Sequence, residues 1–187
     1  MSERICPWWL GYLLASPLRR LLQNPRAVVD PYIREGMTVL EPGPGMGFFT
    51  LELARRVGAS GRVIAVDVQP RMIQGLKRRL AKAGLAERVD ARIAEKQSLG
   101  MDDMAGKVDF TLAFAMVHEM PDSSQFFQQT AKASKPGAQI LLAEPAGHVS
   151  TERFEKELRE AAQAGFKVVN RPRFRHSQAA LLEKMRP

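Results

Sequence analysis

A glycine-rich loop between an apolar run and a helical pattern constrains this 187-residue chain most. The apolar run ends at Glu41, and the loop after it has glycine at every second position, at Gly43, Gly45 and Gly47. Glycines let a ligand lie against bare backbone, and the start of a helix offers unpaired N–H groups. The segment therefore predicts a nucleotide-sized site, in which the acidic Glu41 favours a ligand with a cationic group over a pyrophosphate.

Strand and helix patterns alternate along the chain. Apolar runs predict strands at 37–41, 62–67, 89–94, 108–116 and 139–143. Helix-spaced apolar residues and capping signals predict helices at 17–23, 25–34, 48–57, 70–83, 123–134 and 151–164. Pro136 and Gly137 predict a turn before the fifth strand. Such alternation is typical of an α/β fold with a doubly wound parallel sheet.

The end of the chain has a different pattern. Residues 166–170 and 177–182 are predicted strands with only a turn between them, and so short a connection permits only an antiparallel pair. The predicted fold class is therefore α/β: a doubly wound, mostly parallel seven-stranded sheet with a C-terminal antiparallel hairpin.

The composition, 45% hydrophobic and 26% charged, is that of a soluble globular protein. Cys6 is the only cysteine, which excludes an intramolecular disulfide and makes a reducing cytoplasm the simplest location. The apolar residues 5–15 are too short to span a bilayer and lack a small-residue cleavage site. We expect a cytoplasmic protein.

The net charge of +8 raises the possibility of a nucleic-acid partner. Residues 101–150, where substrate loops are expected, hold 3 basic and 6 acidic side chains. An acidic substrate-binding region does not suit an enzyme that binds the phosphate backbone of a nucleic acid. A solvated basic surface is therefore the preferred interpretation, and a nucleic-acid partner is not expected.

The glycine spacing excludes two common nucleotide sites. A dinucleotide fingerprint requires glycine at position 48, where the chain has Phe48, and no Gly-Lys-Ser/Thr follows to make a P-loop. Asp67 ends the second predicted strand, 20 residues after Gly47, where a carboxylate can accept both ribose hydroxyls. Together with Glu41, these features predict adenosine that carries a cationic amino-acid tail.

Three segments resemble signatures of the Rossmann-like (class I) S-adenosylmethionine-dependent methyltransferases, small-molecule type. They are Glu41-x-Gly43-x-Gly45-x-Gly47, Val63–Asp67 and Lys135–Ile140, and the similarity covers about residues 25–182. The resemblance implies S-adenosylmethionine as methyl donor and S-adenosylhomocysteine as product.

The same resemblance implies the cofactor-binding residues. Glu41 would lie near the ammonium group, Asp67 would bind the ribose, and Val68 and Met72 would flank the adenine. The full implied set is Glu41, Pro42, Gly43, Pro44, Gly45, Gly47, Asp67, Val68, Met72, Ala94, Glu95 and Phe114.

His118 follows the fourth predicted strand, where a methyl acceptor is expected. It is a candidate general base, with Glu119 to orient it or to bind a polar group of the substrate. The alternative is a loop histidine bonded to backbone. His148 is a second substrate-side candidate, and His176 is expected at the surface. No metal site is predicted, because the carboxylates that follow the fourth and fifth strands, Glu119, Asp122 and Glu144, are scattered in the sequence.

The N-terminal segment, residues 1–24, is predicted as a lid or substrate segment preceding a cofactor-binding domain at 25–187. Trp8, Trp9 and Tyr12 could enclose an apolar or aromatic molecule. Plain core packing and peripheral membrane contact remain alternatives.

The predicted function is in-line methyl transfer to a small, apolar or aromatic molecule. The chain is similar in general appearance to methyltransferases of quinone precursors. No Asn/Asp-Pro-Pro-aromatic segment follows the fourth strand, which disfavours methylation of exocyclic base nitrogens, and one cysteine is too few for a thiolate-bound arsenic site. The rivals are a non-catalytic cofactor-binding or RNA-binding module and, less favoured, a nicotinamide-dependent dehydrogenase.

Overall fold

The computed structural model describes residues 24–95 and 97–186. The chain divides into two units, one up to Ala94 and one from Glu95. The predicted helix at 17–23 and the side chains of Trp8, Trp9 and Tyr12 lie outside the described residues.

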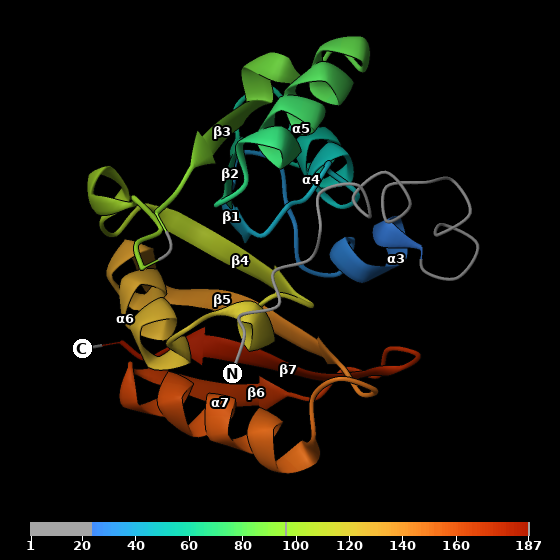
Figure 1. The fold of residues 1–187 in the computed structure, drawn as a ribbon. Helices are drawn as coiled ribbons and strands as arrows, with labels where there is room; N and C mark the ends of the chain where they lie inside the picture. Colours follow the sequence, from blue (N-terminus) through green and yellow to red (C-terminus); the bar gives the residue numbers. More distant parts are fainter. Residues whose placement is uncertain (1–23, 96, 187) are drawn as a thin grey trace. The chain divides into compact units, whose positions relative to one another are not determined.

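The first unit is a three-stranded parallel sheet with helices. Its strand order is β3-β2-β1, with Leu40 opposite Ile64 and Val63 opposite Val89. Residues 63–67 are buried, as expected for a strand covered on both faces. The elements are α3 (Pro25–Val29), β1 (Thr38–Pro42), α4 (Thr50–Arg56), β2 (Arg62–Asp67), α5 (Pro70–Lys82), η1 (Ala86–Arg88) and β3 (Val89–Ile93) (Figure 1).

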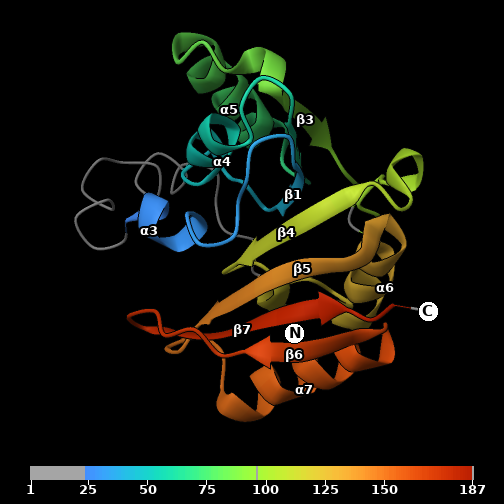
Figure 2. The same ribbon diagram turned by 180° about the vertical axis from the view of Figure 1, so that it is seen from behind.

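The second unit is a four-stranded mixed sheet. Its order is β4-β5-β7-β6, parallel between β4 and β5 and antiparallel where β7 meets both neighbours (Figure 2). The helices α6 and α7 pack against each other, and α7 also packs on β6. The elements are η2 (Asp102–Met104), β4 (Val108–Phe114), η3 (Val117–Glu119), α6 (Ser123–Ala133), β5 (Ser134–Pro145), α7 (Thr151–Gln163), β6 (Phe166–Asn170) and β7 (Ser177–Lys184).

The register of β7 brings the start of that strand to the carboxyl end of β5. Ser177 is opposite Pro145, and the Ala146 N–H donates to the His176 carbonyl at 3.0 Å. The strand directions and the closing hairpin confirm the predicted fold class.

The predicted turn at Pro136-Gly137 is wrong as an element boundary, because β5 already begins at Ser134. The pairing between β4 and β5 moves from Val108 opposite Ser134 to Phe110 opposite Gln139, so the Pro-Gly pair lies in an irregular part of the strand. Proline and glycine inside a strand mark such an irregularity, but whether the strand continues through them depends on its pairing with the neighbouring strand.

Other boundaries differ for local reasons. The predicted helix at 25–34 ends at Val29, since Pro31 has no N–H to continue it. The strand β4 stops at Phe114, two residues early, because Ala115 has a left-handed φ of 55°. Among the described helices, none combines the length and apolar character needed to cross a membrane.

Candidate functional site

The glycines of the predicted cofactor loop differ in the space around their backbone. Gly43, Gly45 and Gly47 have φ of 66°, 55° and 84°, the left-handed region that favours glycine. A Cβ on Gly47 would lie 2.5 Å from Leu76 Cδ1, so Gly47 lets α5 pack against the loop. A Cβ on Gly45 would meet no described residue within 4 Å. The open space beside the backbone is therefore at Gly45.

Asp67 ties the end of β2 to this loop. Its Oδ2 accepts from the Gly45 N–H at 3.3 Å, and its Oδ1 accepts from the Gln69 N–H at 2.9 Å. The side chain is only 8% exposed. A carboxylate held between the loop and the first turn of α5 has the position that the resemblance implies for a ribose ligand.

Glu41 is buried, and one of its carboxyl oxygens lacks a hydrogen-bond partner among the described residues. The residue is 3% exposed, and the oxygen without a partner is Oε2. Burial raises the pKa of Glu41 to about 8; the Thr50 hydroxyl opposes this rise and the charge of Asp67 adds to it. An unsatisfied buried carboxyl group is costly, so a ligand ammonium group at this position would supply its missing partner. The site thus fits the amino-acid end of S-adenosylmethionine.

The remaining implied cofactor residues fall in both units. In the first, Pro42 ends β1, the Pro44 carbonyl accepts from the Gly47 N–H at 2.9 Å, and the Ala94 N–H donates to the Asp67 carbonyl at 3.0 Å. Met72 is buried in α5 and Val68 is half-buried. In the second unit, Glu95 is exposed, and the Phe114 ring lies 6.1 Å from the Phe174 ring. Their roles in binding remain predictions.

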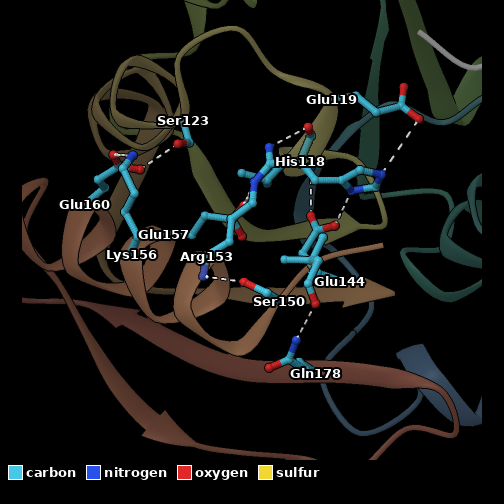
Figure 3. Close-up of polar contacts among 12 residues, drawn as sticks. His118, Glu119, Ser123, Glu144, Ser150, Arg153, Lys156, Glu157, Glu160 and Gln178 are labelled. Carbon is cyan, nitrogen blue, oxygen red and sulfur yellow. Dashed lines mark hydrogen bonds and ion pairs between the residues drawn. The ribbon is translucent and has the colours of Figure 1, made fainter. Parts of the chain in front are cut away.

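The second unit contains a histidine–carboxylate pair at the carboxyl ends of β4 and β5. His118 lies in η3, and its Nδ1 makes a short hydrogen bond with Oε2 of Glu144 in β5. Glu144 is fully buried, and its Oε1 accepts from the Val117 N–H at 2.8 Å. Figure 3 shows the imidazole between Glu144 and Glu119. Both oxygens of Glu144 are therefore used to hold the η3 turn and its imidazole.

The charges around His118 favour its protonated form. Burial lowers the pKa of His118, but the hydrogen bond and charge of Glu144, with the charge of Glu119, outweigh burial and the nearby Arg153. The net pKa lies above the ordinary value of 6.5. Since Glu144 occupies Nδ1, it fixes the tautomer in which Nε2 can accept a proton.

Glu119 and the other two histidines take different positions. Glu119 Oε1 is 4.0 Å from His118 Nε2, so it does not orient the ring through Nδ1. His148 is exposed, with its ring 6.4 Å from that of His118. His176 is exposed, as predicted, and has a left-handed φ of 61°.

Glu144 is the residue that sequence reasoning missed as a partner of His118. The sequence feature that could have revealed it is the position of Glu144 near the end of the fifth strand, which pairs in parallel with the strand that precedes His118. Asp122 instead caps α6, accepting from the Ser124 and Gln125 N–H groups. In the described part of the chain, no three His, Cys, Asp or Glu side chains are grouped to hold a metal ion.

Comparisons with known proteins identify the family of the chain. A family profile described as a methyltransferase domain matches residues 33–182. The solved structure of an S-adenosylmethionine-dependent methyltransferase from Aquifex aeolicus is similar with a TM-score of 0.85 and 25% identity, covering 96% of this chain and 98% of that one.

Two curated relatives are similar over part of their length. An arsenite methyltransferase of Halobacterium salinarum is 31% identical over 65% of this chain and 30% of that protein. A ubiquinone/menaquinone biosynthesis C-methyltransferase of Idiomarina loihiensis is 30% identical over 60% of this chain and 44% of that protein. The match thus spans less than half the length of either relative. The chain belongs to the methyltransferase-domain family, in the Rossmann-like, S-adenosylmethionine-dependent class.

Proposed function

We propose that this enzyme methylates a small apolar or aromatic molecule whose acceptor atom arrives carrying a proton, and that His118 is the base that removes it. The observation that carries this proposal is the hydrogen bond between His118 Nδ1 and the buried Glu144. A buried carboxylate on Nδ1 leaves Nε2 as the nitrogen that can accept a proton, which is the arrangement that a general base needs.

The chain's residues would divide the work between binding and proton transfer. When bound, S-adenosylmethionine supplies an electrophilic methyl carbon and is converted to S-adenosylhomocysteine. Glu41 and the Gly45 backbone would hold its amino-acid end, and Asp67 would hold its ribose. His118 Nε2 would take the acceptor's proton, while Glu144 stabilises the resulting imidazolium and keeps the ring oriented.

An aromatic pair at the carboxyl end of β4 supports an apolar or aromatic acceptor. Phe114 ends β4, and Phe174 lies against it from the β6–β7 connection. The C-methyltransferase relative has a name that refers to quinone synthesis, which agrees with this substrate class. The sequence has a single cysteine, Cys6, which supports an organic acceptor over arsenite. The substrate roles of Trp8, Trp9, Tyr12 and His148, and a cytoplasmic location, stay predictions.

The test combines calorimetry with turnover. S-Adenosylmethionine and S-adenosylhomocysteine should bind the wild-type chain, and Asp67→Ala should abolish that binding. A panel of phenols, quinols and enols is then screened for a mass increase of one methyl group. On the acceptor found, His118→Ala should keep cofactor binding and slow turnover about 100-fold or more.

The outcomes separate the candidate functions. Undiminished turnover by His118→Ala would overturn the role of His118 as base. Cofactor binding without turnover of any compound in the panel would favour the non-catalytic module. Failure to bind either sulfur compound would contradict the assigned cofactor loop.

A further inference from the structure

A second buried carboxyl group lies behind the His118–Glu144 pair. Glu157 is in α7 and is 1% exposed, and neither of its side-chain oxygens has a hydrogen bond within the described residues. The cation paired with it is Arg153, whose Nε is 3.6 Å from Glu157 Oε1. An ionised carboxylate in this position is poorly compensated, so burial favours the neutral acid.

The charges that reach Glu157 come from three elements. The pKa of Glu157 is raised to about 7: burial and the charge of Glu144 in β5 raise it, and Arg153 and His118 lower it. Glu160 also raises it, although the Glu160 carboxylate accepts from the Ser123 hydroxyl of α6 and pairs with Lys156. Glu157 therefore changes charge in the pH range in which an imidazole does.

Arg153 connects Glu157 physically to the turn that carries His118. Its Nη2 donates to the His118 carbonyl at 2.6 Å, while its Nε faces Glu157 (Figure 3). The first turn of α7 is itself fixed, because the Ser150 side chain accepts from the Arg153 N–H at 3.2 Å. The charge state of Glu157 is thus coupled to a hydrogen bond with η3 as well as to Glu144.

We propose that Glu157 is a positioning residue that sets the proton affinity of His118 through Glu144 and Arg153, and that its neutral form is the working form. With Glu157 neutral, Glu144 is the main negative charge behind the imidazole, and His118 can cycle between neutral and protonated forms. An ionised Glu157 adds a further negative charge to those of Glu144 and Glu119, which holds His118 as imidazolium and unable to accept a proton. This inference rests on the proposed role of His118 as base.

The experiment is a nuclear magnetic resonance titration of the His118 ring in the full chain, without cofactor or acceptor. In the wild type, His118 should titrate over a broad range, because two interacting groups share the transition. In Glu157→Gln, it should titrate as one group, with a proton affinity lowered about threefold or more, equivalent to about half a pKa unit. Once an acceptor is known, the acid limb of kcat/KM should move to lower pH by the same amount.

Glu160→Gln is the matched control, since it removes a carboxylate from the same helix face. It should leave the His118 titration close to that of the wild type. An unchanged titration in Glu157→Gln, or an equal shift in Glu160→Gln, would overturn the proposal. If Glu157→Gln does not fold, Glu157→Met has a similar volume, needs no hydrogen bond and gives the same readout.

The two proposals can fail separately. The titration needs neither substrate, so it tests the coupling alone, whereas turnover by His118→Ala tests the base. If Glu157→Gln shifts the His118 titration but His118→Ala is fully active, His118 is not the base, while its coupling to Glu157 stands. An unshifted titration with inactive His118→Ala would remove the role of Glu157 only.

Discussion

Four glutamates are buried among the described residues. Glu52 is paired with Arg26, Arg55 and Arg56, and the other three differ in how their charge is compensated, in a way that matches the role proposed for each. Glu41, Glu144 and Glu157 are 3%, 0% and 1% exposed. Of these three, only Glu144 has both oxygens engaged, by the Val117 N–H and by His118. Glu41 has one oxygen without a partner among the described residues, and Glu157 has two. A buried carboxyl group with spare acceptors is costly to the fold, so each is a place where a ligand or a proton can be gained.

Glu41 gives a proton-linked prediction for cofactor binding. Its pKa of about 8 means that the folded apo-protein holds Glu41 mostly protonated at pH 7. Its protonated form contributes stability below the unfolded value of 4.5, and this contribution is lost as pH rises towards 8. A ligand ammonium favours the carboxylate, so binding of S-adenosylmethionine at pH 7 should release close to one proton.

Calorimetry in buffers of different ionisation enthalpy measures that release. Glu41→Gln should release no proton from this site and bind at least about tenfold more weakly, which is about 1.4 kcal/mol. Asp30→Asn, which removes an exposed carboxylate paired with Arg56, is the control and should behave as the wild type. Equal release by the wild type and Glu41→Gln would contradict the assignment of the ammonium group to Glu41.

Sequence reasoning could find Glu41 and Asp67 because each ends a predicted strand at a fixed distance from the glycines. It could name His118 because the residue follows the fourth strand. It could not pair His118 with Glu144, which is 26 residues away and meets the ring only through the parallel register of β4 and β5. The near neighbour Glu119 was the natural choice from the sequence, but in η3 its side chain approaches Nε2 instead.

At the scale of elements, the loop between β1 and α4 combines two kinds of glycine. Gly47 is required by the approach of Leu76 in α5, and Gly45 leaves open space. A sequence pattern cannot tell these roles apart, because both positions have a positive φ and the same spacing. The same limit applies to β5, whose early start at Ser134 depends on the register with β4. The periodic helices and the buried β2, by contrast, follow from local pattern alone.

Gly45 and Gly84 form a matched pair for testing the loop. Both have a positive φ, 55° and 66°, and at either position an added Cβ would meet nothing within 4 Å in the part of the chain that the structure describes. Gly45→Ala and Gly84→Ala should each lower the free energy of unfolding by about 1 kcal/mol through backbone strain. Only Gly45→Ala should also weaken S-adenosylhomocysteine binding, because its methyl group enters the space beside the loop.

Denaturant unfolding and calorimetric titration measure the two effects. Gly47→Ala should cost more stability, about 2–4 kcal/mol, since its Cβ would overlap Leu76. If Gly45→Ala binds the product as tightly as Gly84→Ala does, the open space is not part of the cofactor site.

At the scale of the whole molecule, the charge is unevenly shared. The net charge is +8, yet residues 101–150 hold 3 basic and 6 acidic side chains. The helix α5 has basic residues and no acidic ones: Arg71, Lys77, Arg78, Arg79 and Lys82. Binding to nucleic acid through such a helix would be electrostatic and independent of sequence. The excess charge therefore argues for weak, non-specific contacts and gives no support for RNA as the methyl acceptor.

Charge reversal on α5 tests this at the level of the intact chain. Lys77 and Lys82 are exposed, so Lys77→Glu with Lys82→Glu should abolish weak RNA binding and flatten its dependence on salt. Binding of S-adenosylhomocysteine should change less than about twofold, because neither lysine belongs to the proposed site. Filter binding with labelled RNA measures the first effect, and calorimetry measures the second. Wild-type chain incubated with labelled S-adenosylmethionine and RNA should transfer no methyl label. Transfer of label to RNA, with binding that persists at physiological salt, would replace the small-molecule acceptor by RNA, since a solvated basic surface predicts neither result.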